Sequence, residues 1–243
     1  MQSRFLHAHL WLGMMLAVLF MTNGCGHSRR IAPKTASLED LAKQLNGEDQ
    51  SRRLTAMKQI QSMQREALPL VSDLIELLNS DDVLVRTEAF STLAKLGNTA
   101  KKAVPALRKA LKNEDLGMRL VAAHALIAVR PRSRSEVLPV ALDGLRHSHS
   151  PTAILVNLLF AQIGPSALPI LIRRLESDDP IVRQNVVNSI RFIGCPDNSA
   201  LDALSSLSNS EKDPIVRKAV LEALAALQKD VCTTVSTRQP TLD

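Results

Sequence analysis

Apolar residues recur along the chain in a pattern that repeats at a nearly constant interval. Six positions mark the successive repeats and set that interval, namely Arg53, Arg86, Arg119, Ala153, Arg183 and Arg217. Apolar or small residues stand three, seven and ten positions after each marker. These spacings place the side chains on one face of an α-helix. The pattern therefore predicts an amphipathic first helix in each repeat.

A second leucine-rich segment lies between each first helix and the next marker. Several of these segments contain a proline near their start, namely Pro69, Pro105, Pro139 and Pro169. Proline suits the first turn of a helix, where its missing N–H would have no partner anyway. Glycines follow the last apolar position of three first helices, at Gly97, Gly164 and Gly194, as is typical of a helix end. Each repeat is therefore predicted to be a helix pair.

The predicted repeat array covers residues 38–229, and it begins with a half repeat. Leu45, Asn46 and Asp49 stand one repeat interval before Leu78, Asn79 and Asp82, so residues 38–49 match the second half of a repeat. Ser37 and Asp40 have the spacing of a capping box. We expect an all-α protein, an α-solenoid of stacked antiparallel helix pairs, followed by a disordered tail over residues 230–243.

The five-residue stretch DPIVR occurs twice, at Asp179–Arg183 and at Asp213–Arg217. An aspartate stands four residues before each marker arginine, at Asp49, Asp82, Asp115, Asp179 and Asp213. The repeat that has Ala153 lacks both residues and has His149 at the acidic position. We expect the aspartate to cap its helix, and the arginine to pair with that aspartate or with the aspartate of the next repeat. The motif is thus interpreted as a structural clamp.

Helix pairs of this length, with an arginine near the start of the first helix, resemble short bacterial HEAT repeats of the phycobilisome-lyase type. The resemblance covers residues 38–229. It implies a superhelical scaffold whose second helices line the concave side and bind a protein. The resemblance also leaves two alternatives open: an accessory subunit or lyase-like enzyme, and a spacer that binds nothing.

The N-terminal segment has the layout of a secretory signal. Arg4 is followed by a continuous apolar run, Leu10–Met21, which is shorter than the roughly 20 residues that a membrane span needs. The segment resembles a bacterial lipoprotein signal, with Gly24 before Cys25. That resemblance implies a signal peptide over residues 1–24, acylation of Cys25 with chains such as palmitate, and a flexible tether over residues 25–37.

The lipoprotein resemblance also implies a location in the bacterial cell envelope, facing the periplasm or the exterior. Gly26 is not the aspartate that marks inner-membrane retention in enteric-type lipoproteins, so an outer-membrane location is favoured. The alternatives are an ordinary signal peptide and an uncleaved anchor, each with an incidental cysteine.

Composition and motifs point away from catalysis and from nucleic acid. The formal charge of +6 comes from interspersed residues without a long basic run, which is typical of a solvated surface. We find no phosphate-binding loop, nucleophile elbow or cysteine–histidine constellation. His124 is expected on the surface, and His147 and His149 in a solvated turn. We therefore expect a protein that is not an enzyme and has no cofactor or metal.

Charged residues stand four and seven positions after the prolines of the second helices. They are Asp73, Glu76, Lys109, Lys112, Asp143, Arg146, Arg173 and Glu176. The signs alternate along the array, which suits a protein partner better than a polyanion. We predict that this row binds the partner; the alternative is a merely solvated helix face.

Two further cysteines lie near the same end of neighbouring repeats. Cys195 follows Gly194, and Cys232 lies three residues beyond the equivalent place in the next repeat. Oxidising conditions outside the cytoplasm would allow a disulfide between them. Alternatively, Cys195 is a buried apolar residue and Cys232 belongs to a frayed tail.

Overall fold

The computed structural model describes residues 36–147, 150–194 and 198–236. Within these ranges the chain is helical and contains no strand, which confirms the all-α prediction. The predicted signal peptide, Cys25, most of the tether, His149 and Cys195 lie outside the described residues. Cys232 lies on α13, but the predicted disulfide involves Cys195 and so also lies outside them.

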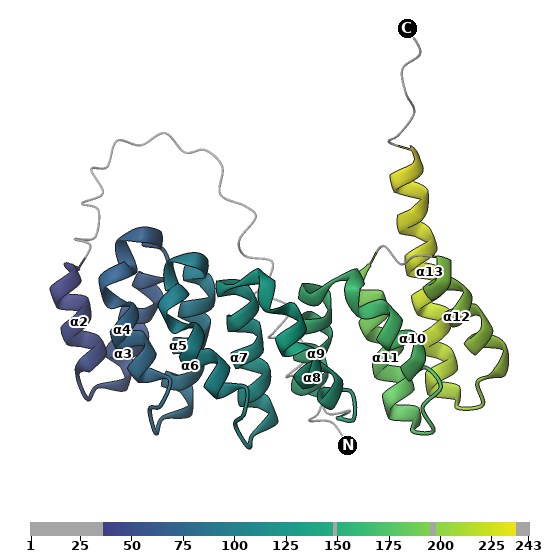
Figure 1. Cartoon of the computed structure of the whole chain (residues 1–243), viewed down its shortest axis with the longest axis horizontal. Helices are drawn as coiled ribbons and strands as arrows, with labels where there is room; N and C mark the ends of the chain where they lie inside the picture. The colour runs from purple at the N-terminus through teal and green to yellow at the C-terminus, as the bar shows by residue number, and fades with distance from the viewer. Residues whose placement is uncertain (1–35, 148–149, 195–197, 237–243) are drawn as a thin grey trace, which may run out of the picture. The chain divides into compact units, whose positions relative to one another are not determined.

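The described helices form pairs that follow one another in chain order (Figure 1). The first helices are α3 (Gln50–Ile60), α5 (Val83–Leu96), α7 (Leu116–Val129), α9 (Ser150–Ile163), α11 (Pro180–Ile193) and α13 (Pro214–Ser236). The second helices are α2 (Leu38–Asn46), α4 (Val71–Leu77), α6 (Val104–Ala110), α8 (Arg134–Gly144), α10 (Leu168–Arg174) and α12 (Asn198–Ser210). Short 3₁₀ helices lead into four of these: η1 (Gln64–Leu70), η2 (Gly97–Ala103), η3 (Pro131–Ser133) and η4 (Pro165–Ala167).

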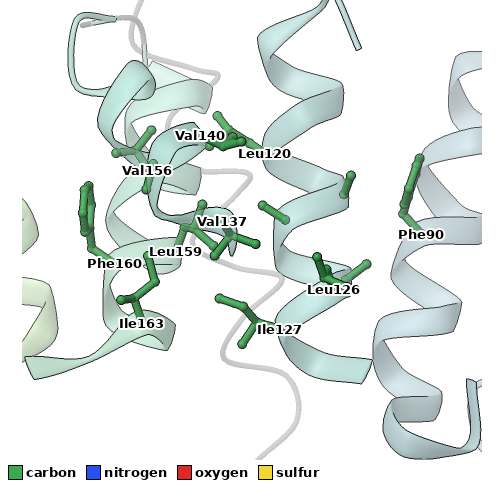
Figure 2. Close-up of a cluster of buried hydrophobic side chains, with 14 of the residues drawn as sticks. Phe90, Leu120, Leu126, Ile127, Val137, Val140, Val156, Leu159, Phe160 and Ile163 are labelled. Atoms are coloured by element: carbon green, nitrogen blue, oxygen red, sulfur yellow. The ribbon is translucent and has the colours of Figure 1, made fainter. Parts of the chain in front are cut away.

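Each first helix packs against the next first helix, and each second helix packs against the first helix that follows it. The positions three residues after the markers are buried in all six repeats. Figure 2 shows side chains of α7, α8 and α9 that fill the space between repeats, among them Leu126, Val137 and Phe160. Removal of this apolar surface from water, worth about 25 cal/mol per Å², stabilises the stack. The predicted repeat pattern is confirmed.

The capping box is also confirmed, because Ser37 Oγ accepts from the Asp40 N–H at 3.1 Å and the Asp40 carboxylate accepts from the Ser37 N–H. Two of the four prolines, Pro105 and Pro169, lie in the first turn of a second helix as predicted. The prediction is wrong at Pro139, because η3 runs directly into α8 and places this proline inside the helix. Pro69 lies within η1.

The C-terminal boundary differs from the prediction. Helix α13 continues to Ser236, so the beginning of the predicted disordered tail is helical. After Pro214 at its start, no proline or glycine interrupts α13 as far as Ser236, which is consistent with a continuous helix over this range. Among the described residues, no single helix has the length and apolarity of a membrane span; only Thr152–Ile163 and Pro165–Arg174 meet that test jointly, with a 105° bend between them.

Candidate protein-interaction surfaces

The aspartates of the repeat motif cap the first helices as predicted. At each of the five motifs the carboxylate accepts a hydrogen bond from a backbone N–H of the first turn. Asp82, for example, accepts from Leu84 at 2.8 Å and from Val85 at 3.2 Å. Burial alone would raise the pKa of Asp82, but these two N–H groups and the side chain of Gln50 together hold it below its usual value. Such a cap stabilises a helix by about 1 kcal/mol.

The arginines do not pair with these aspartates, and the predicted ion pair is wrong. Each marker arginine reaches back to the carbonyl oxygen six residues earlier, in the loop that follows the preceding second helix. The distance is 2.6 Å from Arg53 Nε to Gly47 O and 2.7 Å from Arg183 Nη1 to Ser177 O. Carbonyls in such a loop have no partner in a helix, so the guanidinium supplies the donor that they lack. Among the described residues no ion pair joins a marker arginine to a motif aspartate.

The repeat without an arginine obtains an equivalent donor from its neighbour. Ala153 stands at the marker position, and the carbonyl six residues earlier belongs to His147. Asn185 of α11 donates its amide to this oxygen at 3.3 Å and to Leu145 O at 2.9 Å. Asn185 is buried. It therefore does from the following first helix what an arginine does in the other repeats.

Arg183 also binds Glu211, which sequence reasoning missed. Its Nε and Nη2 atoms lie 2.7 and 2.8 Å from the two carboxylate oxygens. The side chains are only 16% and 3% exposed, respectively. Hydrogen bonds from Arg183 lower the pKa of Glu211 from 4.5 to about 2, against the raising effect of burial. Glu211 thereby links α11 to the loop before α13. An arginine therefore does link two repeats, but its acidic partner is Glu211 and not a motif aspartate.

A second arginine–glutamate pair has the same geometry in a more exposed setting. Arg108 of α6 donates two hydrogen bonds to Glu136 of α8, at 2.6 and 2.8 Å. Here the side chains are 43% and 34% exposed. Arg108 likewise lowers the pKa of Glu136 to about 2. Since water screens exposed charges, we expect this pair to contribute less to stability than Arg183–Glu211.

His124 is a link between repeats and not the simple surface residue we predicted. It is partly buried, with Nε2 at 2.9 Å from Leu155 O and Nδ1 at 2.8 Å from Gln162 Oε1 on α9. Helix α9 packs beside His124 and covers part of it. His147 is exposed, and no group of three or more metal-ligating side chains lies together in the described ranges.

The eight predicted partner-binding residues lie on the second helices or directly after them. Asp143 is bound by Arg119 Nη2 at 2.7 Å, so it serves the stacking of repeats. The side chains of the other seven make no hydrogen bond or ion pair within the described part of the chain. Asp73 is partly buried and the remaining six are exposed. These seven, here called the second-helix row, stay available to a partner.

The two kinds of turn lie along opposite edges of the array (Figure 1). We call the loops that precede the first helices, such as 80–82 and 177–179, the start edge. The turns that follow the first helices, such as 61–66 and 97–102, form the end edge. The start edge carries the capping aspartates and the bound carbonyls. The end edge carries exposed cations whose side chains make no hydrogen bond or ion pair in the described residues: Arg65, Lys101, Lys102, Arg130 and Arg132. Of these, Arg130 adds its charge to the effect of Arg108 in lowering the pKa of Glu136.

A groove opens on the end edge between η1 and η2. It has a volume of about 500 Å³ and is lined by Gln64, Arg65, Leu68, Lys95 and Lys101 among others. Our sequence reasoning did not single out these residues. The regular glycine position was the available signal, because Gln64 stands eleven residues after its marker, where three other repeats have Gly97, Gly164 and Gly194.

Gln64 has a backbone conformation that favours glycine. Its φ is 53°, the same as at Gly97, and it is the only non-glycine residue with positive φ among those described. A side chain in this region costs roughly 1–2 kcal/mol relative to the right-handed region. Strain of this kind is found more often at functional sites than elsewhere.

Comparison with known proteins agrees with this architecture. The family described as HEAT repeats matches residues 38–127 and 138–225. No curated protein matches the chain.

Among solved structures, the complex of CpcE and CpcF of phycocyanin lyase from Nostoc sp. PCC7120 is similar at 20% identity and a TM-score of 0.50, covering 84% of this chain and 82% of that one. YIBA_ECOLI is similar at 13% identity and a TM-score of 0.51, covering 88% and 82%. At these identities the likeness concerns the fold alone. The extent of the repeat match shows that the chain belongs to the HEAT-repeat family.

Proposed function

We propose that the chain is a lipid-anchored scaffold of the bacterial cell envelope that binds a protein partner outside the cytoplasm. The observation that carries the binding role is the second-helix row. Its seven charged residues have both signs and no side-chain partner within the described structure, whereas the motif aspartates and the marker arginines of the start edge are already engaged. Complementary charges of mixed sign fix the register of a protein partner and discourage wrong ones.

The anchoring role rests on the N-terminal sequence up to Cys25. Acylation of Cys25 would hold the array at a membrane, and two or more acyl chains anchor a protein stably where one does not. Gly26 favours the outer membrane. Replacing Cys25→Ser should abolish acyl labelling and release or misprocess the chain. Membrane retention of a wild type that carries no acyl label would instead indicate an uncleaved anchor.

Crosslinking in the native membrane, followed by mass spectrometry, tests the binding role. Charge reversal of Lys109, Lys112 and Arg173 together should weaken capture of the partner and leave helicity unchanged. As a matched control, charge reversal of Lys43, Lys58 and Arg174, which are exposed, have no side-chain partner in the described structure and lie outside the row, should leave capture unchanged. Full capture by the second-helix variant would show that this row is not the binding face.

The alternative is an accessory or lyase-like role in the manner of the phycobilisome-lyase type. The likeness to the phycocyanin lyase complex supports the fold and carries no activity to this chain. A partner captured by the wild-type chain that proves to be a chromophore-binding protein would favour this alternative over a general scaffold.

A further inference from the structure

We propose that the groove between η1 and η2 binds an extended acidic segment of the partner protein. This inference rests on the proposed function and adds a second contact surface, on the end edge, with a defined ligand chemistry. The occupant we infer is a peptide stretch rich in aspartate or glutamate.

The chemistry of the groove suits carboxylates. Arg65 and Lys101 are exposed, line the groove from its two sides, and have no side-chain hydrogen bond or ion pair in the described structure. Lys95 also lines it and donates one hydrogen bond to Gln61 Oε1 at 2.6 Å, which leaves two of its three donors. An arginine can bind a carboxylate through two parallel hydrogen bonds, and lysine adds a point charge. Glu66, in the same turn, does not line the groove.

The fold does not require these cations, nor does it favour Gln64. Three other repeats have a glycine with positive φ at the equivalent sequence position, directly after the first helix, whereas α3 ends at Ile60, before Gln64. A glycine at position 64 would remove the steric cost of its positive φ. The chain nevertheless retains a long polar side chain in the left-handed region, beside Arg65 and within the groove. A binding role for this turn explains both features together.

The spacing along the edge matches an extended chain. Packed helices lie roughly 8–10 Å apart, and an extended peptide advances about 3.3 Å per residue. About three residues of an extended peptide therefore span the distance from one turn to the next. A peptide with an acidic residue at every third position could place one in the groove and the next beside Arg130 and Arg132. The series of end-edge cations ends at this turn, since the next one, η4 (Pro165–Ala167), contains no charged residue.

The shape of the site favours a peptide over a membrane or a nucleic acid. The groove is concave, and Leu68, 47% exposed, offers it an apolar contact. A lipid surface would meet the cations without entering the groove. A nucleic-acid backbone gains its affinity from many phosphate contacts, and cations on three turns supply few.

Fluorescence anisotropy with labelled octaglutamate tests the inference on the full-length chain in neutral detergent. The wild type should bind the peptide, and raising the salt concentration should weaken binding. Arg65→Glu with Lys101→Glu should lower the affinity by about tenfold or more. Lys58→Glu with Arg174→Glu, a matched control at two exposed cations outside both the groove and the second-helix row, changes the net charge equally and should lower it by less than about threefold.

Each other outcome overturns the inference in an identifiable way. Equal losses in the two variants would show that net charge alone attracts the peptide. Binding to vesicles of phosphatidylglycerol or to single-stranded DNA that depends on Arg65 and Lys101, without peptide binding, would assign the edge to a membrane or a nucleic acid. If octaglutamate does not bind but the native partner is still captured, only this inference fails. If the wild type captures no partner, the proposed function fails as well.

Discussion

The two edges of the array use charge in opposite ways. On the start edge, aspartates cap the first helices and arginines bind carbonyls in the loops that follow the preceding second helices. On the end edge, the side chains of Arg65, Lys101, Lys102, Arg130 and Arg132 make no hydrogen bond or ion pair in the described structure. Charge on the start edge thus holds the repeats together. These five cations of the end edge remain for a partner, so stability and binding should respond to different substitutions.

The largest effect should come from the buried ion pair of the start edge. Arg183→Ala leaves Glu211 buried without its partner and exposes two carbonyls, so the free energy of unfolding should fall by about 3 kcal/mol. Urea denaturation followed by circular dichroism measures this loss. Arg108→Ala removes a pair of the same geometry in an exposed setting, and it should cost only a small fraction of that amount. Equal losses at the two sites would contradict the role we assign to burial.

Acid should weaken the same link. The pKa of Glu211 lies at about 2 in the folded chain and at 4.5 as the ordinary value, so its contribution is complete above pH 4.5 and is lost as the pH falls toward 2. Between about pH 6 and pH 3 this amounts to roughly 2 kcal/mol. Between about pH 6 and pH 3, the free energy of unfolding of Glu211→Gln should therefore fall by roughly 2 kcal/mol less than that of the wild type. Parallel curves would mean that Glu211 is not held by Arg183 in solution.

The repeat without an arginine offers a rescue experiment. Asn185→Ala should lower the free energy of unfolding by about 1–2 kcal/mol, because two carbonyls lose their donor. Ala153→Arg in the same chain should restore the part of this loss that comes from the His147 carbonyl, because an arginine there would reach that oxygen, while the Leu145 carbonyl stays without its donor. If Ala153→Arg has the same effect with and without Asn185, the two side chains do not share this task.

Relief of strain on the end edge should have the opposite sign. Gln64→Gly should raise the free energy of unfolding by about 1 kcal/mol, because glycine adopts positive φ without steric cost. Gln59→Gly is the matched control, since it places glycine inside α3 and should destabilise by up to about 1 kcal/mol. A loss of stability at Gln64→Gly would show that its side chain supports the fold.

The sequence was sufficient for the repeats and for the helix caps. Apolar spacing determines which helix face is buried, and an aspartate finds its partners within the same turn, so both can be predicted locally. The backbone carbonyl that Arg183 binds could not be predicted. Every residue has a backbone carbonyl, so the sequence does not indicate which one accepts the hydrogen bond. Glu211 and Asn185 were missed for a related reason, since each occurs at one repeat only and their contacts lie far away along the chain.

The free cations of the end edge were missed for another reason. The overall charge is mild and interspersed, and it gives no sign that one edge holds several unpaired cations. The prolines of the second helices directed attention to the second-helix row, whose residues are mostly unpaired as well. Structure separates the two classes of charge by showing which groups already have partners.

The central claim is that the charges of the end edge serve binding and not folding. The most direct test is one chain in which Arg65, Lys101, Lys102, Arg130 and Arg132 are all replaced by alanine. We predict that its free energy of unfolding stays within about 1 kcal/mol of the wild type, as for unpaired surface residues, and that octaglutamate no longer binds. A loss of several kcal/mol, or peptide binding at the wild-type level, would contradict the account.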